Sequence, residues 1–416
     1  MPPVSTTDMA VDSDAASPSP PGSLMTLLEE ADALQATDPA KAEARYHAIL
    51  DAPSTPAPTD TLPATATTTT TTSVAAAGIA FEEEENRVKV KEGAIAGLAE
   101  VFVKRGDAAA IADLGKKLRV SFFTTIAKAK TAKIVRSLID AVARIPGTLE
   151  SGVQVQMCEE TVVWCKQERR TFLRQRIEAR LAALRLDAKR YTDAMTIITS
   201  LLREVKRMDD KAHLLEIQLL ESRVYHALRN LPKSRAALTS ARTTANAIYV
   251  PPALQGEIDM QAGIVAAEEK DYKTAYSYFY EAFEGFSSLE DPRAVRNLKY
   301  MLLCKIMTNN APDIATIMTG SVALKYSGPE VDAMKAVGAA YEARLLQNFE
   351  DALDEHKPHL SDDPVVHAHL STLYDALLEG NLSRIIEPFS KVEIAHVAKL
   401  IKLPLETVEA KLSQMI

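Results

Sequence analysis

The segment GIVAAEEKDYKTAYSYFYEA, Gly263 to Ala282, decides the fold. Small and large residues alternate along it at fixed offsets around a central turn. These residues are Gly263, Tyr272, Ala275, Phe279 and Ala282. Small side chains let two antiparallel helices approach closely, and large ones fill the space beside them. The segment therefore predicts a tightly packed helical hairpin.

The same pattern of turn and small residue recurs along the chain. It is seen at Tyr191 and Ala194, Leu231 and Ser234, Ala311 and Ile314, Phe349 and Ala352, and more weakly at Ala108 and Ile111. The step between repeats is about 40 residues, longer than the ~34 of strict tetratricopeptide arrays and closer to a HEAT repeat. Because one hairpin cannot bury its own apolar face, neighbours must stack. We therefore predict a right-handed α-solenoid of degenerate tetratricopeptide-like hairpins over residues 81–378.

The composition agrees with an all-α protein. The 416 residues include only 15 Gly and 6% aromatic residues, and hardly any alternating apolar run is present. The net charge of -8 argues against broad binding to nucleic acid or acidic membranes. Three scattered cysteines and no signal peptide predict an intracellular protein without disulfides. The longest apolar stretch, Ala94 to Val103, is too short to span a bilayer, so we expect no membrane partner.

The first 80 residues divide into three segments by composition. Residues 1–23 are rich in Pro, Ser and Asp, which predicts disorder. Residues 24–50 carry two apolar stripes separated by Asp38-Pro39, which predicts a helical hairpin. Residues 51–80 form a Pro, Ala and Thr tract without periodicity, including the run Thr67 to Thr72, and we interpret this tract as a linker.

The C-terminal stretch NLSRIIEPFSKVEIAHVAKLIKLPLETVEAKLSQMI, Asn381 to Ile416, contains two short amphipathic helices. Ser390 and Glu393 fit a capping box that would start the first, and Pro404 suits the first turn of the second. Two such helices joined by a tight turn predict a helix-turn-helix. A DNA-reading second helix would carry several basic or amide side chains. This one offers Glu406, Glu409 and a single Lys411, which favours packing against protein.

No residue pattern predicts catalysis. His367 and His369 resemble the paired histidines of a zinc isopeptidase, but Leu377 occupies the serine position of that motif. Residues two apart on a helix point about 200° from each other and cannot share one metal. Cys158 and Cys165 lack further ligands at zinc spacing and are typical of buried small hydrophobes. Gly115-Lys116 is not followed by Ser or Thr, so it does not fit a phosphate-binding loop. We expect no enzyme activity, metal, cofactor or small-molecule substrate.

A run of basic residues lies between positions 116 and 136. Its members are Lys116, Lys117, Arg119, Lys128, Lys130, Lys133 and Arg136. A solvated edge of the solenoid explains these charges most simply. The functional interpretation is a docking surface for an acidic partner, and a nucleic-acid patch ranks third. We take the seven residues, called the basic edge below, as candidate partner-binding residues.

At this level the chain resembles a known family. A helical-repeat rod running into LYDALLEGNLSRIIEPFSKVEIAHVAKLIKLPLETVEAKLSQMI is similar to the PCI domain shared by the proteasome lid, the signalosome and translation initiation complexes. The segments RTFLRQRIEARL, LLESRVYHALRNLPKSRAALTSARTTANAIYVPP and AAEEKDYKTAYSYFYEAFEGF resemble the non-ATPase subunits of the 26S proteasome lid. The resemblance covers residues 87–416.

The resemblance implies a non-catalytic structural subunit in ubiquitin-dependent protein degradation. Such a subunit would scaffold lid assembly and clamp the regulatory particle to the core particle. The implied partners are sister PCI subunits, the core α-ring and the ATPase ring, and the implied localisation is cytoplasm and nucleus. The alternatives are a PCI subunit of a signalosome-like or RNA-associated complex and the zinc isopeptidase.

The resemblance also assigns residues 379–416 to a PCI winged helix. The family continues into a β-hairpin wing and a long helix, so we expect this chain to hold an incomplete, C-terminally truncated winged helix. Its candidate partner-binding residues, called the PCI end below, are Glu387, Phe389, Glu406 and Glu409.

Overall fold

The computed structural model describes residues 21–52, 70–310, 313–344, 346–360, 363–389, 391–401 and 403–415. Within these ranges the regular secondary structure consists of helices, and no strand is present. This confirms the predicted all-α class. The chain forms two compact units, residues 1–189 and 190–416, and each is described by itself. Within each unit, helices that follow one another in sequence pack together as stacked hairpins, which confirms the predicted helical-repeat solenoid. The predicted N-terminal disorder falls largely on residues 1–20, which lie outside the described ranges.

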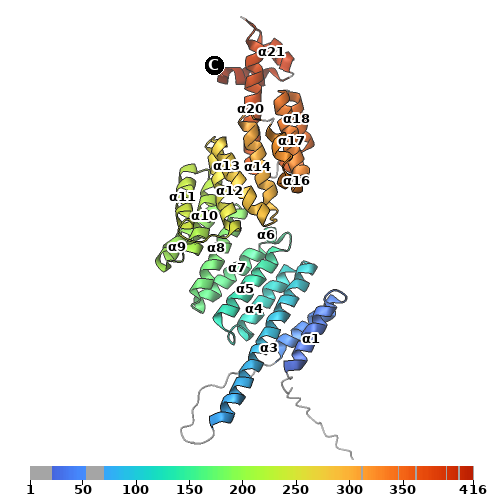
Figure 1. Ribbon diagram of the computed structural model, residues 1–416, viewed down its shortest axis with the longest axis vertical. Coiled ribbons are helices and arrows are strands. Elements are labelled where there is room, and N and C mark those ends of the chain that lie inside the picture. Colours follow the sequence, from blue (N-terminus) through green and yellow to red (C-terminus); the bar gives the residue numbers. More distant parts are fainter. Residues whose placement is uncertain are drawn as a thin grey trace, which may run out of the picture. The chain divides into compact units, whose positions relative to one another are not determined.

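Unit 1 is built from eight described helices (Figure 1). They are α1 (Pro21–Leu34), α2 (Pro39–Asp51), α3 (Thr70–Arg105), α4 (Ala108–Ser121), α5 (Lys128–Ala143), α6 (Thr148–Ser151), α7 (Val153–Gln167) and α8 (Thr171–Asp187). The hairpin expected at residues 24–50 corresponds to α1 and α2, which pack on α3.

The contact between the α1–α2 hairpin and α3 depends on Tyr46 and Gly97. The Tyr46 ring is fully buried, and a Cβ atom at Gly97 would approach it to 2.6 Å. The Tyr46 hydroxyl donates to Asp32 at 2.6 Å, and burial together with this bond raises the pKa of Tyr46. Lys91 of α3 donates to the Ala52 carbonyl at 2.7 Å, which satisfies a free group at the end of α2. One glycine, one tyrosine and one lysine therefore fix the hairpin on α3.

The predicted linker at residues 51–80 differs from the structure at its end. Residues 53–69 lie outside the described ranges, but α3 already begins at Thr70. The segment after it contains Ala75, Ala76 and Ala77, and alanine has the highest intrinsic helix propensity. The threonine-rich composition therefore did not indicate where α3 begins.

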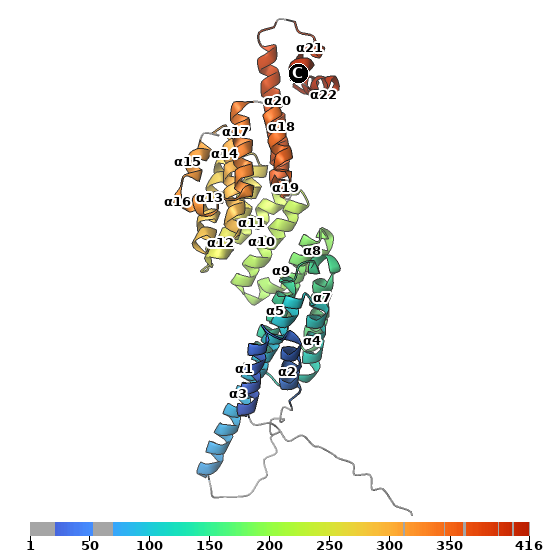
Figure 2. The same ribbon diagram turned by 90° about the vertical axis from the view of Figure 1, so that its right-hand side faces the viewer.

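Unit 2 contains the remaining described helices (Figures 1 and 2). They are α9 (Tyr191–Met208), α10 (Lys211–Ala227), α11 (Leu231–Ala245), α12 (Pro252–Glu268), α13 (Tyr272–Ser288), α14 (Arg293–Met307), α15 (Asp313–Met318), α16 (Ser321–Lys325), α17 (Pro329–Ala343), α18 (Leu346–Glu355), α19 (Lys357–Leu360), α20 (Pro364–Ile386), α21 (Ile394–Ile401) and α22 (Leu405–Met415). Successive helices from α9 to α14 pack against one another.

The α12–α13 hairpin shows the steric fit that its sequence predicts. A Cβ atom at Gly263 would lie 2.5 Å from the Phe279 ring, so only glycine allows this separation of the helices. Ala275 and Ala282 are fully buried on either side of Phe279. The equivalent small residues Ala194 and Ser234, in α9 and α11, are also fully buried. The interlocking of small and large residues is therefore the packing rule of these hairpins.

Several turns between helices contain a non-glycine residue with positive φ. After α12, Lys270 adopts φ +65°, the Asp271 N–H donates to the Ala266 carbonyl at 3.0 Å, and the Asp271 carboxylate caps α13 at the Thr274 N–H, 3.2 Å away. This is a Schellman ending followed directly by an N-cap. Other non-glycine residues with positive φ among the described ones are Arg169, Lys189, Asp209, Arg229, Glu290, Asn309 and Arg344. A two-residue turn therefore suffices between long helices.

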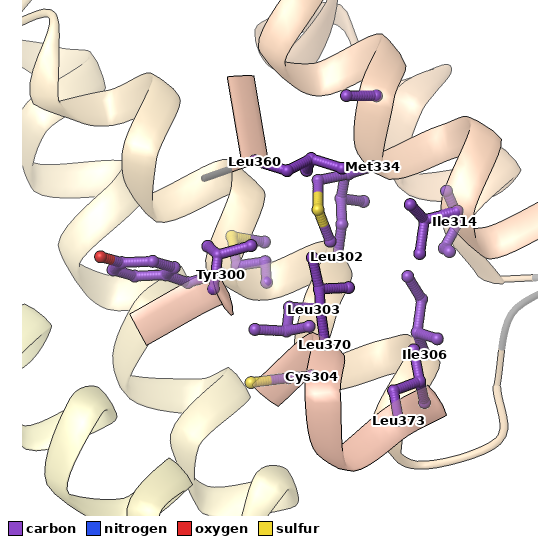
Figure 3. Close-up of a cluster of buried hydrophobic side chains, with 14 of the residues drawn as sticks. Tyr300, Leu302, Leu303, Cys304, Ile306, Ile314, Met334, Leu360, Leu370 and Leu373 are labelled. Carbon is purple, nitrogen blue, oxygen red and sulfur yellow. The ribbon is translucent and has the colours of Figure 1, made fainter. Parts of the chain in front are cut away.

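Helix α14 is the centre of the larger apolar core of unit 2 (Figure 3). It is buried on nearly all sides, which is typical of a central helix. Figure 3 shows Leu302 and Leu303 of α14 beside Met334 of α17 and Leu370 of α20. The buried hydroxyl of Tyr300, in the middle of α14, donates to Asp363 at 2.7 Å. Asp363 also accepts from the Val365 N–H at 3.0 Å. The bond from Tyr300 fixes the start of α20 on α14.

Helices α21 and α22 pack on α20 and on each other, and lie near its C-terminal end (Figure 2). Helix α21 begins at Ile394, after the Lys391 that the capping box predicts, and Ser390 lies outside the described residues. The Lys411 ammonium of α22 is 3.0 Å from both Asp375 and Glu379 of α20. Hydrogen bonds to these carboxylates raise the pKa of Lys411. The one basic residue noted in the last helix thus serves to attach it.

Among the described helices, none has both the length and the apolar character needed to cross a bilayer.

Candidate partner-binding surfaces

The basic edge occupies two helices of unit 1. Lys116, Lys117 and Arg119 lie on α4, whereas Lys128, Lys130, Lys133 and Arg136 lie on α5. The two helices pack against each other, so the structure brings the two halves of the run to neighbouring elements.

Three members of the basic edge have partners inside unit 1. The Lys116 ammonium is 3.3 Å from Glu160 of α7, and the Lys130 ammonium is 3.8 Å from Glu92 of α3. Arg119 is only partly exposed and donates to the Thr161 hydroxyl at 2.6 Å. Burial lowers the pKa of the Arg119 guanidinium. These three cations therefore join α4 and α5 to their neighbours.

The structure places Arg119 differently from the prediction, which put it on an exposed edge of the solenoid. It follows the buried Leu118 on the face of α4 that contacts α7, so its side chain enters the helix interface. No local pattern indicates this contact, because the partner Thr161 is 42 residues away.

The other four residues form the exposed part of the basic edge. Lys117, Lys128, Lys133 and Arg136 are all exposed, and no carboxylate in the described part of the chain lies within ion-pair distance of them. The Arg136 Nε donates only to the Ala132 carbonyl of its own helix, at 3.1 Å. Val120, 83% exposed, lies on α4 with Lys117. Cations without internal partners next to an exposed aliphatic side chain suit an acidic protein surface.

The PCI end lies at the far end of α20 and on α22. Glu387, Phe389, Glu406 and Glu409 are exposed. Phe389 is 46% exposed and meets His396 edge to face, with ring centroids 6.4 Å apart. Further apolar residues of this region are exposed, namely Ile394, Leu400, Leu405 and Met415. A surface with this many uncovered apolar side chains is typical of a protein interface.

The two histidines of α20 do not converge. His367 is exposed, whereas His369 is buried and its ring meets Tyr272 edge to face at 5.8 Å. Nearby, His226 lies 3.5 Å from Glu268, and burial lowers the pKa of both His226 and His369. No group of three or more His, Cys, Asp or Glu among the described residues is arranged to hold a metal ion. The arrangement is that of a buried imidazole seated between helices.

The cysteines are buried thiols. Cys158 and Cys165 lie on α7 and Cys304 on α14. Burial raises the pKa of Cys158 and Cys304 to about 12 and that of Cys165 to about 11. A thiol with a raised pKa is a poor nucleophile and metal ligand, so these residues act as packing groups.

Comparison with known proteins assigns both ends of the chain. A family model described as the 26S proteasome regulatory subunit RPN6 N-terminal domain matches residues 24–188, which end at the boundary of unit 1. A PCI domain model matches residues 353–416, and so includes α20 as well as the predicted winged-helix segment. Among solved structures, a Rap protein complexed with competence and sporulation factor aligns with 95% of this chain and 100% of its own, at TM-score 0.45 and 11% identity, a likeness too low to support an argument.

Curated relatives match most of the chain. It is 58% identical over 329 residues to the 26S proteasome non-ATPase regulatory subunit 11 homolog of Arabidopsis thaliana, covering 79% of this chain and 78% of the relative. It is 52% identical over 328 residues to the Dictyostelium discoideum subunit 11, covering 79% of each. It is 44% identical over 300 residues to the Saccharomyces cerevisiae regulatory subunit RPN6, covering 71% and 69%. The chain therefore belongs to the family of 26S proteasome non-ATPase regulatory subunit 11, also named RPN6.

Proposed function

We propose that this chain is a non-catalytic structural subunit of the 26S proteasome regulatory particle lid. It would scaffold lid assembly and help to hold the regulatory particle on the core particle. The observation that carries the proposal is the 58% identity over 329 residues to a regulatory, non-ATPase subunit 11 homolog. The match covers 79% of this chain and 78% of the relative.

The two candidate surfaces fit a scaffold role. The exposed part of the basic edge is suited to an acidic surface of the core or ATPase ring, and the PCI end is suited to sister PCI subunits through its apolar residues. The three cysteine thiols and the His369 imidazole are buried, so these groups are not in contact with solvent as a nucleophile or general base would be. We further propose that the protein acts in both cytoplasm and nucleus, which imaging of a tagged full-length chain would test.

Affinity purification of the tagged chain from its own cells tests the assembly role. We expect lid subunits in stoichiometric amounts, co-sedimenting with peptidase activity of the core particle. A chain that sediments alone while the endogenous lid remains intact would contradict the proposal. Recovery with signalosome subunits, or with RNA in a salt-sensitive complex, would favour the alternative PCI complexes.

Charge reversal tests the basic edge separately. Replacing Lys117, Lys128, Lys133 and Arg136 with Glu should weaken association with the core particle while lid subunits are still recovered, because the acidic surface would then meet like charge. The matched control reverses four exposed cations of unit 2, Lys206, Lys211, Lys273 and Lys325. Equal loss in both variants would show that only the net charge matters.

A further inference from the structure

A cleft of about 490 Å³ lies within unit 2 where α18, α20 and α21 meet. Its lining includes Arg344, Leu346, Asn381, Arg384, Leu400 and Ile401. A second hollow shares Arg344, Asn381 and Arg384 with it and continues toward Tyr341 and Gly380. The two arginines therefore stand between two connected depressions.

The cleft is positively charged. Among the described residues that line it, Arg344 and Arg384 are the charged ones, both are exposed, and neither has a carboxylate within ion-pair distance in the described part of the chain. The adjoining hollow adds one acidic residue, Glu342, for two guanidinium groups. The N-terminus of α18 also opens here at Leu346, and the free N–H groups of a first helical turn favour anions. The described residues around the cleft thus carry too few carboxylates to neutralise the two guanidinium groups.

The position of Arg344 is fixed by the fold. It ends α17 with φ +54°, and its carbonyl accepts a hydrogen bond from the Asn381 side chain of α20 at 3.2 Å. Arg384 lies one helical turn beyond Asn381 on α20, which places both guanidinium groups at the same cleft.

The opposite wall of the cleft is aliphatic. Leu400 of α21 is 53% exposed, Ile401 and Ile385 are partly buried, and Leu346 is buried beneath them. A free phosphate or a nucleic-acid backbone would leave this wall uncovered, since it offers no apolar group. A ligand that satisfies both walls carries carboxylates and an aliphatic side chain.

We propose that this cleft binds an acidic peptide segment of a partner protein that carries at least one aliphatic anchor. Guanidinium groups bind carboxylates in paired, charge-assisted hydrogen bonds, which would orient the segment. The anchor would cover Leu400 and enter the space beside Ile401. The inference does not rest on the proposed proteasome role, because residues of this chain alone form the cleft.

Fluorescence anisotropy on the full-length chain tests the proposal. The probes are labelled peptides of about ten residues made of Asp, Glu, Leu and Ile in several orders. For so short a segment we expect a Kd on the order of micromolar. In one control set Asn and Gln replace the acids, and in a second set Ser replaces the aliphatic residues. The cleft variant is Arg344→Gln with Arg384→Gln. Its matched control is Arg203→Gln with Arg207→Gln, two exposed arginines of α9.

We expect the cleft variant to weaken binding about tenfold or more and the control variant by less than about twofold. Leu400→Ser should also weaken binding, whereas Leu324→Ser, which alters an equally exposed leucine, should not. Thermal unfolding of each variant checks that the fold is retained.

Several results would overturn the proposal. Equal weakening by the two arginine pairs would mean non-specific attraction, and equal binding of the serine peptides would mean a simple anion site. Absence of binding by every acidic peptide at about 1 mM would exclude a useful affinity. Self-association that the cleft variant abolishes and the peptides do not compete with would assign the cleft to a second copy of the chain.

Discussion

The α12–α13 hairpin and the α21–α22 pair show two ways of holding helices together. In the hairpin, Gly263 admits the Phe279 ring, and the contact is closed to water. In the terminal pair, few side chains are fully buried, Val408 among them, and Lys411 supplies two ion pairs to α20. The hairpin is stabilised by shape and the terminal pair by sparse, partly polar contacts. The same chain thus separates a stable framework from a region that leaves apolar groups for partners.

The largest effect should follow from emptying the hairpin. Phe279→Ala removes a ring that is 1% exposed, so we expect the free energy of unfolding to fall by about 3–5 kcal/mol. Denaturant titration measures this. Tyr280→Ala, at the adjacent 50% exposed position, is the control and should cost under about 1 kcal/mol. Similar losses at both positions would refute the importance of shape.

Filling the hairpin should have the next largest effect. Gly263→Ala places a Cβ atom 2.5 Å from the Phe279 ring, and overpacking of this kind costs about 1–3 kcal/mol. Gly380→Ala, inside α20 where no atom lies within 4 Å, should instead raise the free energy of unfolding by up to about 1 kcal/mol. A double variant with Phe279→Leu should cost less than the sum of its parts, because the smaller side chain makes room. Additive losses would mean that the two residues do not interact.

Relaxing a turn should stabilise the framework. Lys270 has φ +65°, a conformation that glycine adopts without steric cost, so Lys270→Gly should raise the free energy of unfolding by about 1 kcal/mol. Lys273→Gly, within the first turns of α13, should lower it instead by up to about 1 kcal/mol. Thermal denaturation of the two variants would show opposite shifts, and a loss at Lys270 would disprove strain at this turn.

Weakening the terminal pair should have a smaller and local effect. Lys411→Met removes both ion pairs to α20, which with exposed carboxylate partners are worth about 0.2–1 kcal/mol. Hydrogen exchange should accelerate in α21 and α22 and stay unchanged in α12 and α13. Unchanged exchange in α22 would show that its apolar contacts alone hold it.

Lowering the pH slightly below neutral should destabilise unit 2 by as much as Lys411→Met or less. Burial lowers the folded-state pKa of His226 and His369, so the unfolded chain takes up protons first as pH falls below about 6.5. The contribution of these two neutral imidazoles to the stability of unit 2 is therefore fully present above that pH and declines as pH falls through the window between the unfolded and folded pKa values. The double variant His226→Gln with His369→Phe should flatten the pH dependence of the free energy of unfolding between pH 7 and 6. The control variant His367→Gln, at an exposed position, should leave this dependence unchanged.

The packing rule was predictable because it is local. Gly263 and Phe279 belong to one hairpin, so their spacing alone indicates the contact, and the burial of Ala194 and Ser234 follows from the same offsets. The beginning of α3 at Thr70 was not predictable, since a threonine run has no helical periodicity.

The surfaces were less accessible to sequence reasoning. Arg119 and Lys130 appear in one basic run, yet their partners Thr161 and Glu92 come from other helices. Arg344 and Arg384 are 40 residues apart in sequence and carry no pattern that relates them. Contacts between distant helices decide which charges remain unpaired, and a sequence pattern records only neighbours.

The strained turns set a limit on how rigid such an array becomes. Each Arg, Lys or Glu residue with positive φ, from Arg169 to Arg344, leaves its helix ending roughly 1 kcal/mol less stable than glycine would make it. In a protein whose repeats contact mainly their neighbours, this deficit is spread along the chain rather than concentrated at one hinge. We therefore expect local opening at several turns, each at a small cost in free energy, rather than at a single hinge.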